Sequence, residues 1–562
     1  MIKHAKLGVG FSVVILQCSF LELAYAVPLL PIDARGLAMG STGVASAKLA
    51  HAPQYNPALL STAAEDEDFA IVLPQVGVVG ADEEDMIDSV DAIANDEYSG
   101  GSNGDTIFEH FEGITDQLDA ILVSGGSGVV PMEQQLDGFK TLIENVPGNG
   151  GNNNTTSTQL TQAATDLNTS AQSLTGQTQN LEETTLDFTN SLSSISGRAI
   201  RGTAGINGAI AIPSKTFAAA ISVSGSAFFS GRMFFTDSDA SLLNGYAEAI
   251  NSYADSTQTY TNSAEQLATA VESLDNCQTN NSGNAAACAP QAYAVGLYTT
   301  QAESHLSDLQ TFSYDKDGRT ILSTDSTTGD IILNDELTSN VQIVAVGISE
   351  VGLTLSSNFD IAGENIAIGI TPKLQTIKTF NYAARVEEED IEEEAITDTE
   401  QNFSAINLDA GAAYQFGDNN QWQIGLVAKN LISKEYETES NPDSKTGKRT
   451  KTTINLDTQF RSGISHSTDW TVIAFDIDLM ENDPVAFEAP TQYASIGAEL
   501  DLFDTLQLRA GYRTNLSLSD SSVVSAGLGF SPFGAHLDVA VMANPSDVKK
   551  EAGAALELGF YF

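Results

Sequence analysis

The chain has 562 residues, of which 74 are acidic and 25 are lysine or arginine, so its formal net charge is 25 − 74 = −49. A field of this sign repels phosphate backbones and excludes direct nucleic-acid binding. The 46 glycines and only 2 tryptophans argue against one large dry core and favour an architecture of short strands.

The amino terminus has the organisation of an export signal. Two lysines precede the apolar run 7–21, and Ala24-Tyr25-Ala26 matches the small-x-small pattern of a signal-peptidase site. We therefore expect residues 1–26 to be a signal peptide and Val27 to begin the mature chain. No later segment has the roughly 18 consecutive apolar residues of a membrane-spanning helix, so membrane insertion would have to use strands.

Residues 27–67 alternate poorly and are rich in small side chains. The run from Asp33 to Ala47 reads D-A-R-G-L-A-M-G-S-T-G-V-A-S-A, and Asn56-Pro57-Ala58 follows it. Small residues permit close backbone packing in a narrow space. We interpret this segment as a hatch inside a barrel, with Arg35 able to pair with an acidic residue of the wall.

Period-two alternation dominates the rest of the chain and predicts an all-β fold. In residues 506–513, Leu506, Leu508, Ala510 and Tyr512 share one face, while glycine and polar residues form the other. Residues 68–562 are expected to form an outer-membrane antiparallel β-barrel of about 14 strands. The predicted strands are 69–80, 203–213, 216–229, 338–358, 365–382, 403–416, 421–433, 450–464, 469–481, 489–502, 505–515, 521–530, 534–544 and 553–562.

Every second connection between consecutive predicted strands is short. Bacterial barrels keep their short turns in the periplasm, so both chain ends would face the periplasm. This parity requires 338–358 to be a single long strand. The last strand places Leu556, Leu558, Phe560 and Phe562 on one apolar face, and its aromatic end resembles the terminal signal of outer-membrane barrels.

Two long loops, 81–202 and 230–337, are expected to be extracellular insertions containing helices. Leucine, phenylalanine or isoleucine recurs every seven residues from Leu160 to Ile195, the spacing of a coiled-coil seam. Cys277 and Cys288 predict a disulfide that closes the tip of a helical hairpin. Partly disordered loops are the alternative, because residues 147–156 have the composition of a linker.

Charged residues of the barrel strands are expected to face the lumen. One interpretation makes them a selectivity lining, and the favoured one makes them an ion-pair network that holds the hatch, because the interiors of plugged barrels are polar by default. The set comprises Asp476, Asp478, Glu499, Asp501, Arg509, Arg513, His536 and Asp538, together with Lys429 and Glu557.

Two further patterns contain residue types that can carry chemistry. The acidic run 387–394 offers oxygen ligands for calcium, but it lacks the glycine-turn spacing of a calcium loop and reads better as a solvated loop. His536 and Asp538 would suit a hydrolase, but no nucleophile or third partner accompanies them. We therefore expect no enzyme, no catalytic residue, no metal site and no cofactor.

The small-residue opening followed by Asn56-Pro57-Ala58 resembles the hatch of FadL-type outer-membrane transporters. Segments similar to Gly425–Leu431 and Phe475–Leu479 bring the resemblance closer to a FadL-related family, the conjugal-transfer TraF-like outer-membrane barrels. It covers the hatch and most of the barrel but not the helical loops. It implies a plugged barrel that admits small hydrophobic compounds from outside and releases them through a lateral or luminal opening.

These patterns predict a protein of the outer membrane of a Gram-negative bacterium. The first functional hypothesis is a FadL-like channel for uptake of small hydrophobic compounds. The alternative is a structural or adhesive surface component, associated with conjugal transfer, that uses the barrel as an anchor for its helical loops. Expected partners are outer-membrane lipid, the barrel-assembly machinery and a small hydrophobic solute. The chain has no C-x-x-C motif, so a role in DNA transfer would be structural.

Overall fold

The computed structural model describes residues 32–62, 69–95, 107–124, 130–146, 156–281, 285–325, 331–334, 337–361, 363–385, 393–442, 448–503 and 505–561. The predicted signal peptide, most of the acidic run 387–394 and Phe562 lie outside these ranges. The chain divides into a barrel unit, comprising residues up to Asp88, Gly197–Phe234 and Ser339–Phe562, and a helical unit, comprising Ser89–Ser196 and Phe235–Thr338.

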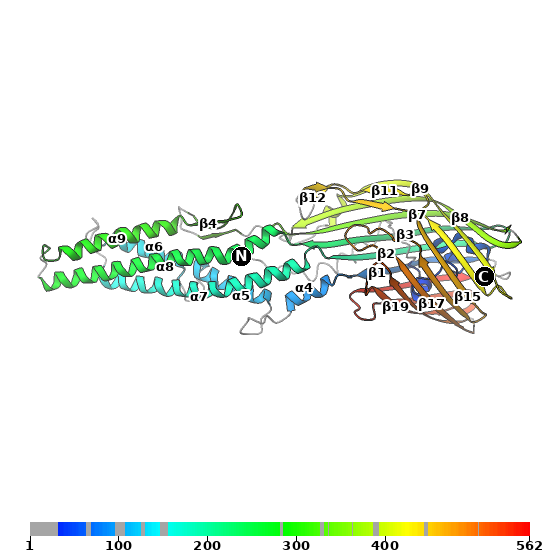
Figure 1. Ribbon diagram of the computed structural model, residues 1–562, viewed down its shortest axis with the longest axis horizontal. Helices are drawn as coiled ribbons and strands as arrows, with labels where there is room; N and C mark the ends of the chain where they lie inside the picture. Colours follow the sequence, from blue (N-terminus) through cyan, green and yellow to red (C-terminus); the bar gives the residue numbers. More distant parts are fainter. Residues whose placement is uncertain are drawn as a thin grey trace. The chain divides into compact units, whose positions relative to one another are not determined.

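The barrel unit is a closed antiparallel barrel of 14 strands, as the alternation predicts (Figure 1). Each strand pairs with the next barrel strand in the sequence, and β1 pairs with β21 to close the ring. The strands are β1 (Ala70–Ala81), β2 (Ala199–Ile212), β3 (Ala218–Phe234), β7 (Asn340–Ile361), β8 (Glu364–Arg385), β9 (Gln401–Phe416), β10 (Trp422–Lys429), β15 (Gln459–Ser467), β16 (Thr471–Asp478), β17 (Tyr493–Leu502), β18 (Leu506–Asn515), β19 (Ser522–Phe530), β20 (Ala535–Ala543) and β21 (Glu551–Tyr561).

The two faces of the strands differ as the sequence pattern requires. In β21 the apolar side chains of Leu556 and Leu558 point outward and are 44% and 46% exposed, whereas Glu557 between them is 1% exposed. Large apolar residues on the other strands, such as Ile473 and Val541, repeat this outward exposure. The outer surface is therefore apolar and the lumen polar, the arrangement of a barrel that lipid surrounds.

The strand β7 spans 340–361 without interruption and pairs with β3 and β8. Its continuity preserves the predicted parity of the turns. The short connections, including 213–217, 417–421 and 531–534, all lie at one end of the antiparallel barrel, and the two long insertions start from the opposite end.

One predicted strand, 450–464, is wrong in part. The barrel strand β15 begins only at Gln459, while β14 (Thr453–Leu456) pairs with β11 (Lys434–Glu437) in a separate two-stranded sheet. Within the same connection, β12 (Asn441–Pro442) pairs with β13 (Arg449–Thr450). The alternation in 453–456 serves a local cluster, because Ile454, Leu456 and Tyr436 are buried together.

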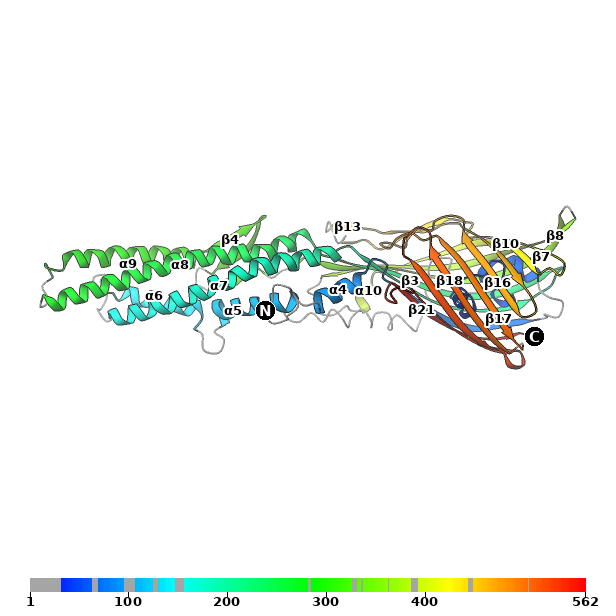
Figure 2. The same cartoon turned by 60° about the horizontal axis from the view of Figure 1, so that its bottom comes forward.

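The helical unit contains α5 (Ile107–Asp119), η3 (Ala120–Ser124), α6 (Met132–Glu144), α7 (Ser157–Ile195), α8 (Asp237–Asn280) and α9 (Ala289–Gln310) (Figures 1 and 2). The helix α4 (Met86–Asn95) begins in the barrel unit and ends in the helical unit. A small sheet of β4 (Ser313–Lys316), β5 (Arg319–Thr324) and β6 (Ile331–Leu333) completes the helical unit, and α10 (Glu393–Thr397) belongs to the barrel unit.

The seven-residue pattern of α7 becomes its buried face. Leu160, Leu167, Leu174 and Leu181 are fully buried in a core shared with α8, and Thr156 opens the helix with a capping box to Gln159. Cys277 and Cys288 form a disulfide with an S–S distance of 2.02 Å, linking the last turns of α8 to the start of α9. None of the helices in the described ranges is long and apolar enough to cross a membrane.

Candidate functional site

The segment Asp33–Thr62, called the hatch below, lies inside the barrel and is almost entirely buried (Figure 2). It consists of α2 (Ala34–Ala38), η1 (Leu49–His51), α3 (Ala52–Tyr55) and η2 (Pro57–Ser61). The helix α2 packs against β1 and β18 to β21, and η2 packs against β3 and β7 to β9. The hatch therefore reaches across the lumen from one side of the wall to the other.

The hatch stabilises its own short helices through side-chain caps. The carboxylate of Asp33 accepts a hydrogen bond from the Gly36 amide at 2.6 Å and one from the Tyr55 hydroxyl at 2.5 Å. Asn56 caps η2 by accepting from the Ala58 amide at 3.1 Å. Pro57 then occupies the first helical position, where the absence of an N–H is harmless.

Asn56 also joins the hatch to the wall. Its Nδ2 donates to the carbonyl of Val44 at 3.0 Å and to the carbonyl of Ala412 in β9 at 3.1 Å. The side chain is fully buried. An alanine here would leave both carbonyls and the Ala58 amide without this partner, and unmade buried hydrogen bonds destabilise by about 1–3 kcal/mol each.

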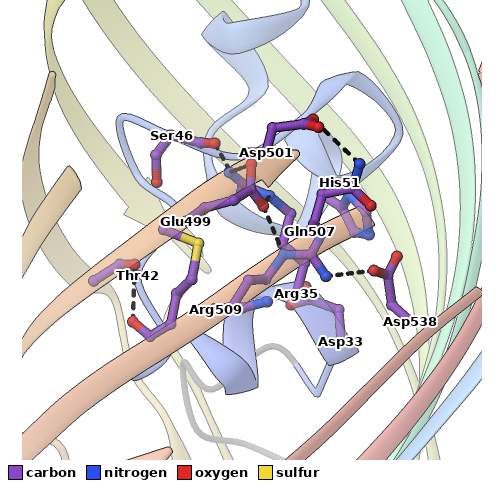
Figure 3. Close-up of polar contacts among 12 residues, drawn as sticks. Asp33, Arg35, Thr42, Ser46, His51, Glu499, Asp501, Gln507, Arg509 and Asp538 are labelled. Carbon is purple, nitrogen blue, oxygen red and sulfur yellow. Dashed lines mark hydrogen bonds and ion pairs between the residues drawn. The ribbon is translucent and has the colours of Figure 1, made fainter. Parts of the chain in front are cut away.

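A chain of ion pairs runs from the hatch into the wall (Figure 3). Arg35 Nε donates to Glu499 Oε2 at 2.9 Å, and its Nη1 donates to the carbonyl of Ser46 at 2.9 Å. Arg509 Nε reaches the same Glu499 oxygen at 2.6 Å, and Arg509 Nη1 pairs with Asp538. All four charged side chains are at most 5% exposed, so solvent screens these pairs weakly.

The chain of contacts continues to two histidines. His536 Nε2 lies 3.5 Å from Asp538 Oδ2 and 3.1 Å from Glu557 Oε1. His51 of the hatch places its Nε2 2.8 Å from the same Glu557 oxygen. His536 and Asp538, the pair considered in the sequence as a catalytic one, therefore contact each other and Glu557.

The remaining predicted lumen residues occupy separate positions. Asp476 accepts from the amides of Gly43 and Val44 at 2.7 and 2.9 Å and so anchors the hatch backbone. Arg513 pairs with Glu551 at 2.6 Å and contacts Ser41. The other three belong to wall contacts, as follows: Asp478 with Arg461, Asp501 with Gln507, and Lys429 with Asp409.

The hatch backbone packs against a row of glycines in the barrel wall. A Cβ at any of these positions would meet a hatch atom first: Asn56 at Gly411, the Val44 carbonyl at Gly425 and the Met39 carbonyl at Gly497, for example. Glycine is needed here because the two backbones approach closely. The glycine row comprises Gly369, Gly411, Gly425, Gly497, Gly511 and Gly527 of β8, β9, β10, β17, β18 and β19.

Sequence reasoning missed the glycine row and three hatch residues, Asp33, His51 and Tyr55. The glycine signal was present, since glycine recurs on the non-apolar face of successive strands. The three hatch residues carry no comparable signal in the sequence, because their role depends on how the irregular backbone of the hatch folds within the lumen.

Burial and neighbouring charges shift the pKa values of three hatch side chains. Burial, partly offset by the charge of His51, raises the pKa of Asp33. Burial and the nearby Asp33 charge raise the pKa of Tyr55 well above its ordinary value of 10.0, so the hydroxyl keeps the proton it donates. Burial alone would lower the pKa of His51, but the charge of Glu557 outweighs it and raises that pKa.

Solved structures with similar folds include the toluene transporter TbuX of Ralstonia pickettii, with 10% identity, a TM-score of 0.39 and coverage of 95% of this chain and 99% of that chain. The toluene transporter TodX of P. putida matches with 10% identity, a TM-score of 0.37 and coverage of 95% and 99%. A FadL homologue of Pseudomonas aeruginosa matches with 8% identity, a TM-score of 0.38 and coverage of 96% and 99%. No curated protein gives a significant match.

A family model described as "F plasmid transfer operon, TraF, protein" matches residues 53–478. The matched region contains the last third of the hatch, with Asn56-Pro57-Ala58, both long insertions and the strands from β1 to β16. This is more than half of the sequence. The chain belongs to the family described as F plasmid transfer operon, TraF, protein.

Proposed function

We propose that this protein is an outer-membrane channel whose lumen is closed by the hatch and opens for small hydrophobic compounds when the hatch moves. The observation that carries the proposal is the attachment of the hatch. It forms no strand of the barrel, and it is held by side-chain contacts such as Arg35 to Glu499 and Asn56 to Ala412. Contacts of this kind can break while the strand pairing remains.

The location is supported by the outer surface. The apolar side chains of Ile473, Val541 and Leu558 point away from the lumen. They are 53%, 56% and 46% exposed, respectively. In water such a surface would be strongly unfavourable, at about 25 cal/mol per Å². Lipid is its matching solvent, and the barrel-assembly machinery is the corresponding partner for insertion. With the short turns in the periplasm, the two long insertions would be extracellular.

The solute class rests on the resemblance of the hatch, with Asn56-Pro57-Ala58, to that of FadL-type transporters. Asn56→Ala tests it, because this change loosens the hatch without altering the barrel strands. Uptake of a panel of small hydrophobic compounds should change in Asn56→Ala and stay at the wild-type level in Asn419→Ala, a matched change at an exposed turn. Heat-modifiable gel mobility verifies that both barrels are folded. Unchanged uptake in Asn56→Ala across the panel would contradict the proposal.

A second function is favoured by the helical unit. It has its own hydrophobic core, including Leu160, Tyr253 and Leu267, and its own disulfide, so it has the internal contacts of an independent domain. A surface or conjugal-transfer component would use it for cell contact. Excision of residues 235–335 should then abolish cell contact or partner binding with solute uptake unchanged. Retained contact would remove this candidate.

A further inference from the structure

Five ionisable side chains converge where the hatch meets the last two strands. Asp33 and His51 come from the hatch, His536 and Asp538 from β20, and Glu557 from β21. The potential ligand atoms of Asp33, His51 and Glu557 lie within 4.8 Å of one another, as do those of His536, Asp538 and Glu557. Each of the five residues is at most 4% exposed. Glu557 belongs to both groups, but the two histidines share neither, so one ion takes its ligands from one group.

One atom of this cluster lacks a hydrogen bond. Glu557 Oε1 faces both histidines, but Glu557 Oε2 is buried and has no hydrogen-bond partner among the described residues. A buried carboxylate oxygen without a donor is costly, because neither water nor protein replaces its hydration. A hydrogen-bond donor or a bound cation would satisfy this oxygen.

The net charge of the cluster and its neighbours also favours a bound cation. The connected residues include four carboxylates, Asp33, Glu499, Asp538 and Glu557, and two guanidinium groups, Arg35 and Arg509. With neutral histidines the balance of these six groups is 2 − 4 = −2, and Lys48, whose charge also acts on Glu499, reduces it to −1. A bound cation would offset this excess of negative charge.

We propose that Asp33, His51 and Glu557 bind a divalent transition-metal ion of the zinc class, with water completing a four-coordinate site. Zinc bonds to histidine nitrogen and carboxylate oxygen are about 2.0–2.2 Å, so neighbouring ligand atoms of a tetrahedral site are roughly 3.3 Å apart. The distance of 2.8 Å between His51 Nε2 and Glu557 Oε1 is close to this separation. Calcium and magnesium prefer oxygen ligands and fit less well.

Such an ion would fasten the hatch to β21, the strand that completes the barrel. The sequence predicted no metal site, because His51 lies 506 positions before Glu557 (557 − 51 = 506) in a segment of irregular backbone. The binding claim is independent of the proposed transport function, since metal binding is measured without any solute.

The test is a metal titration of the full mature chain in detergent, stripped with a chelator beforehand. The wild type should bind one equivalent of Zn²⁺, and Co²⁺ should give the visible absorption of a four-coordinate site. His51→Gln should weaken binding by at least about tenfold. His466→Gln, whose ring packs on Trp422, and His305→Gln of the helical unit are controls that should bind as the wild type does. Absence of stoichiometric binding, or full binding by His51→Gln, would overturn the proposal.

A second measurement needs no variant and remains decisive if the histidine variants fail to fold. Trypsin cleaves after Lys48 of the hatch only when the hatch leaves the wall, whereas Lys451 lies in an exposed connection and reports on protease activity itself. Zn²⁺ should slow cleavage at Lys48 severalfold relative to Mg²⁺ and leave cleavage at Lys451 unchanged. Equal rates at Lys48 in the two ions would overturn the proposed fastening.

Discussion

Arg35 and Glu499 are separated by 464 positions in the sequence, yet the Nε of Arg35 lies 2.9 Å from the Oε2 of Glu499. Glu499 also forms an ion pair with Arg509. One wall carboxylate thus holds a hatch guanidinium and a wall guanidinium together in a site that water barely reaches. The contact makes Glu499 the central electrostatic link between hatch and barrel.

Glu499→Gln should release the hatch. Removing this charge leaves Arg35 and Arg509 buried with less compensation, and breaking a buried pair destabilises by about 3–5 kcal/mol. We expect faster tryptic cleavage at Arg35 and Lys48 in the folded barrel. Glu437→Gln removes an exposed partner of Lys451 and is the control, because exposed pairs contribute about 0–1 kcal/mol. Equal cleavage in the two variants would contradict the role of Glu499.

Gly425→Ala should displace the hatch by steric conflict alone. The added methyl group would overlap the carbonyl of Val44, whereas a methyl group at Gly80 of β1 meets open space. The strand itself tolerates alanine, so Gly425→Ala should fold but show higher ion conductance than Gly80→Ala. Conductance is measured in planar bilayers with both purified proteins. Identical closed behaviour would show that the glycine row does not limit the approach of the hatch.

The barrel rim should lose stability at low pH through Glu83. This carboxylate lies just beyond β1, 3.0 Å from Arg201 Nη2 and 2.7 Å from the Ser521 hydroxyl that donates to it. Burial opposes ionisation, but the charge of Arg201 outweighs it and lowers the pKa of Glu83 below its ordinary 4.5. A lowered pKa gives stabilisation that is present above the ordinary value and lost as pH falls through the folded one.

Glu83→Gln should therefore reduce thermal stability at neutral pH and flatten its decline below about pH 5. Thermal unfolding followed by circular dichroism at several pH values measures both effects. The matched control is Glu248→Gln, which removes a half-exposed partner of Lys316 in the helical unit. A wild-type decline that persists undiminished in Glu83→Gln would exclude this carboxylate as its source.

Reduction of the disulfide should loosen only the helical unit. Cys277 and Cys288 are 11 positions apart, and closing so short a loop contributes about 3 kcal/mol in the chain-entropy account. A Cys277→Ser/Cys288→Ser variant should lower the melting temperature of the helical circular-dichroism signal. The heat-modifiable mobility of the barrel should remain. A loss of barrel mobility would mean that the two units do not fold separately.

The barrel was predictable because its pattern is local. Alternating residues such as Leu556, Glu557 and Leu558 have only two faces to occupy, and the same rule applies to every strand. The prediction failed at 450–464, where the alternation of Ile454 and Leu456 belongs to an additional small sheet. A two-residue alternation identifies a strand, but it does not show to which sheet that strand belongs.

The hatch contacts were not predictable in the same way. Arg35 was expected to meet an acidic wall residue, but nothing in the sequence selects Glu499 over Asp476 or Asp538. The selection depends on how α2 and η1 turn within the lumen, which irregular backbone and capping side chains such as Asp33 determine. Periodicity carries no information about such segments.

Planar-bilayer recording of the wild type beside a variant lacking residues 33–61 tests the central claim most directly. Both proteins are first shown to be folded by heat-modifiable mobility. The account predicts that the wild type conducts little and that the deletion variant, with the lumen emptied, forms a stable open channel. Equal conductance of the two folded barrels would contradict the claim that this segment closes the lumen.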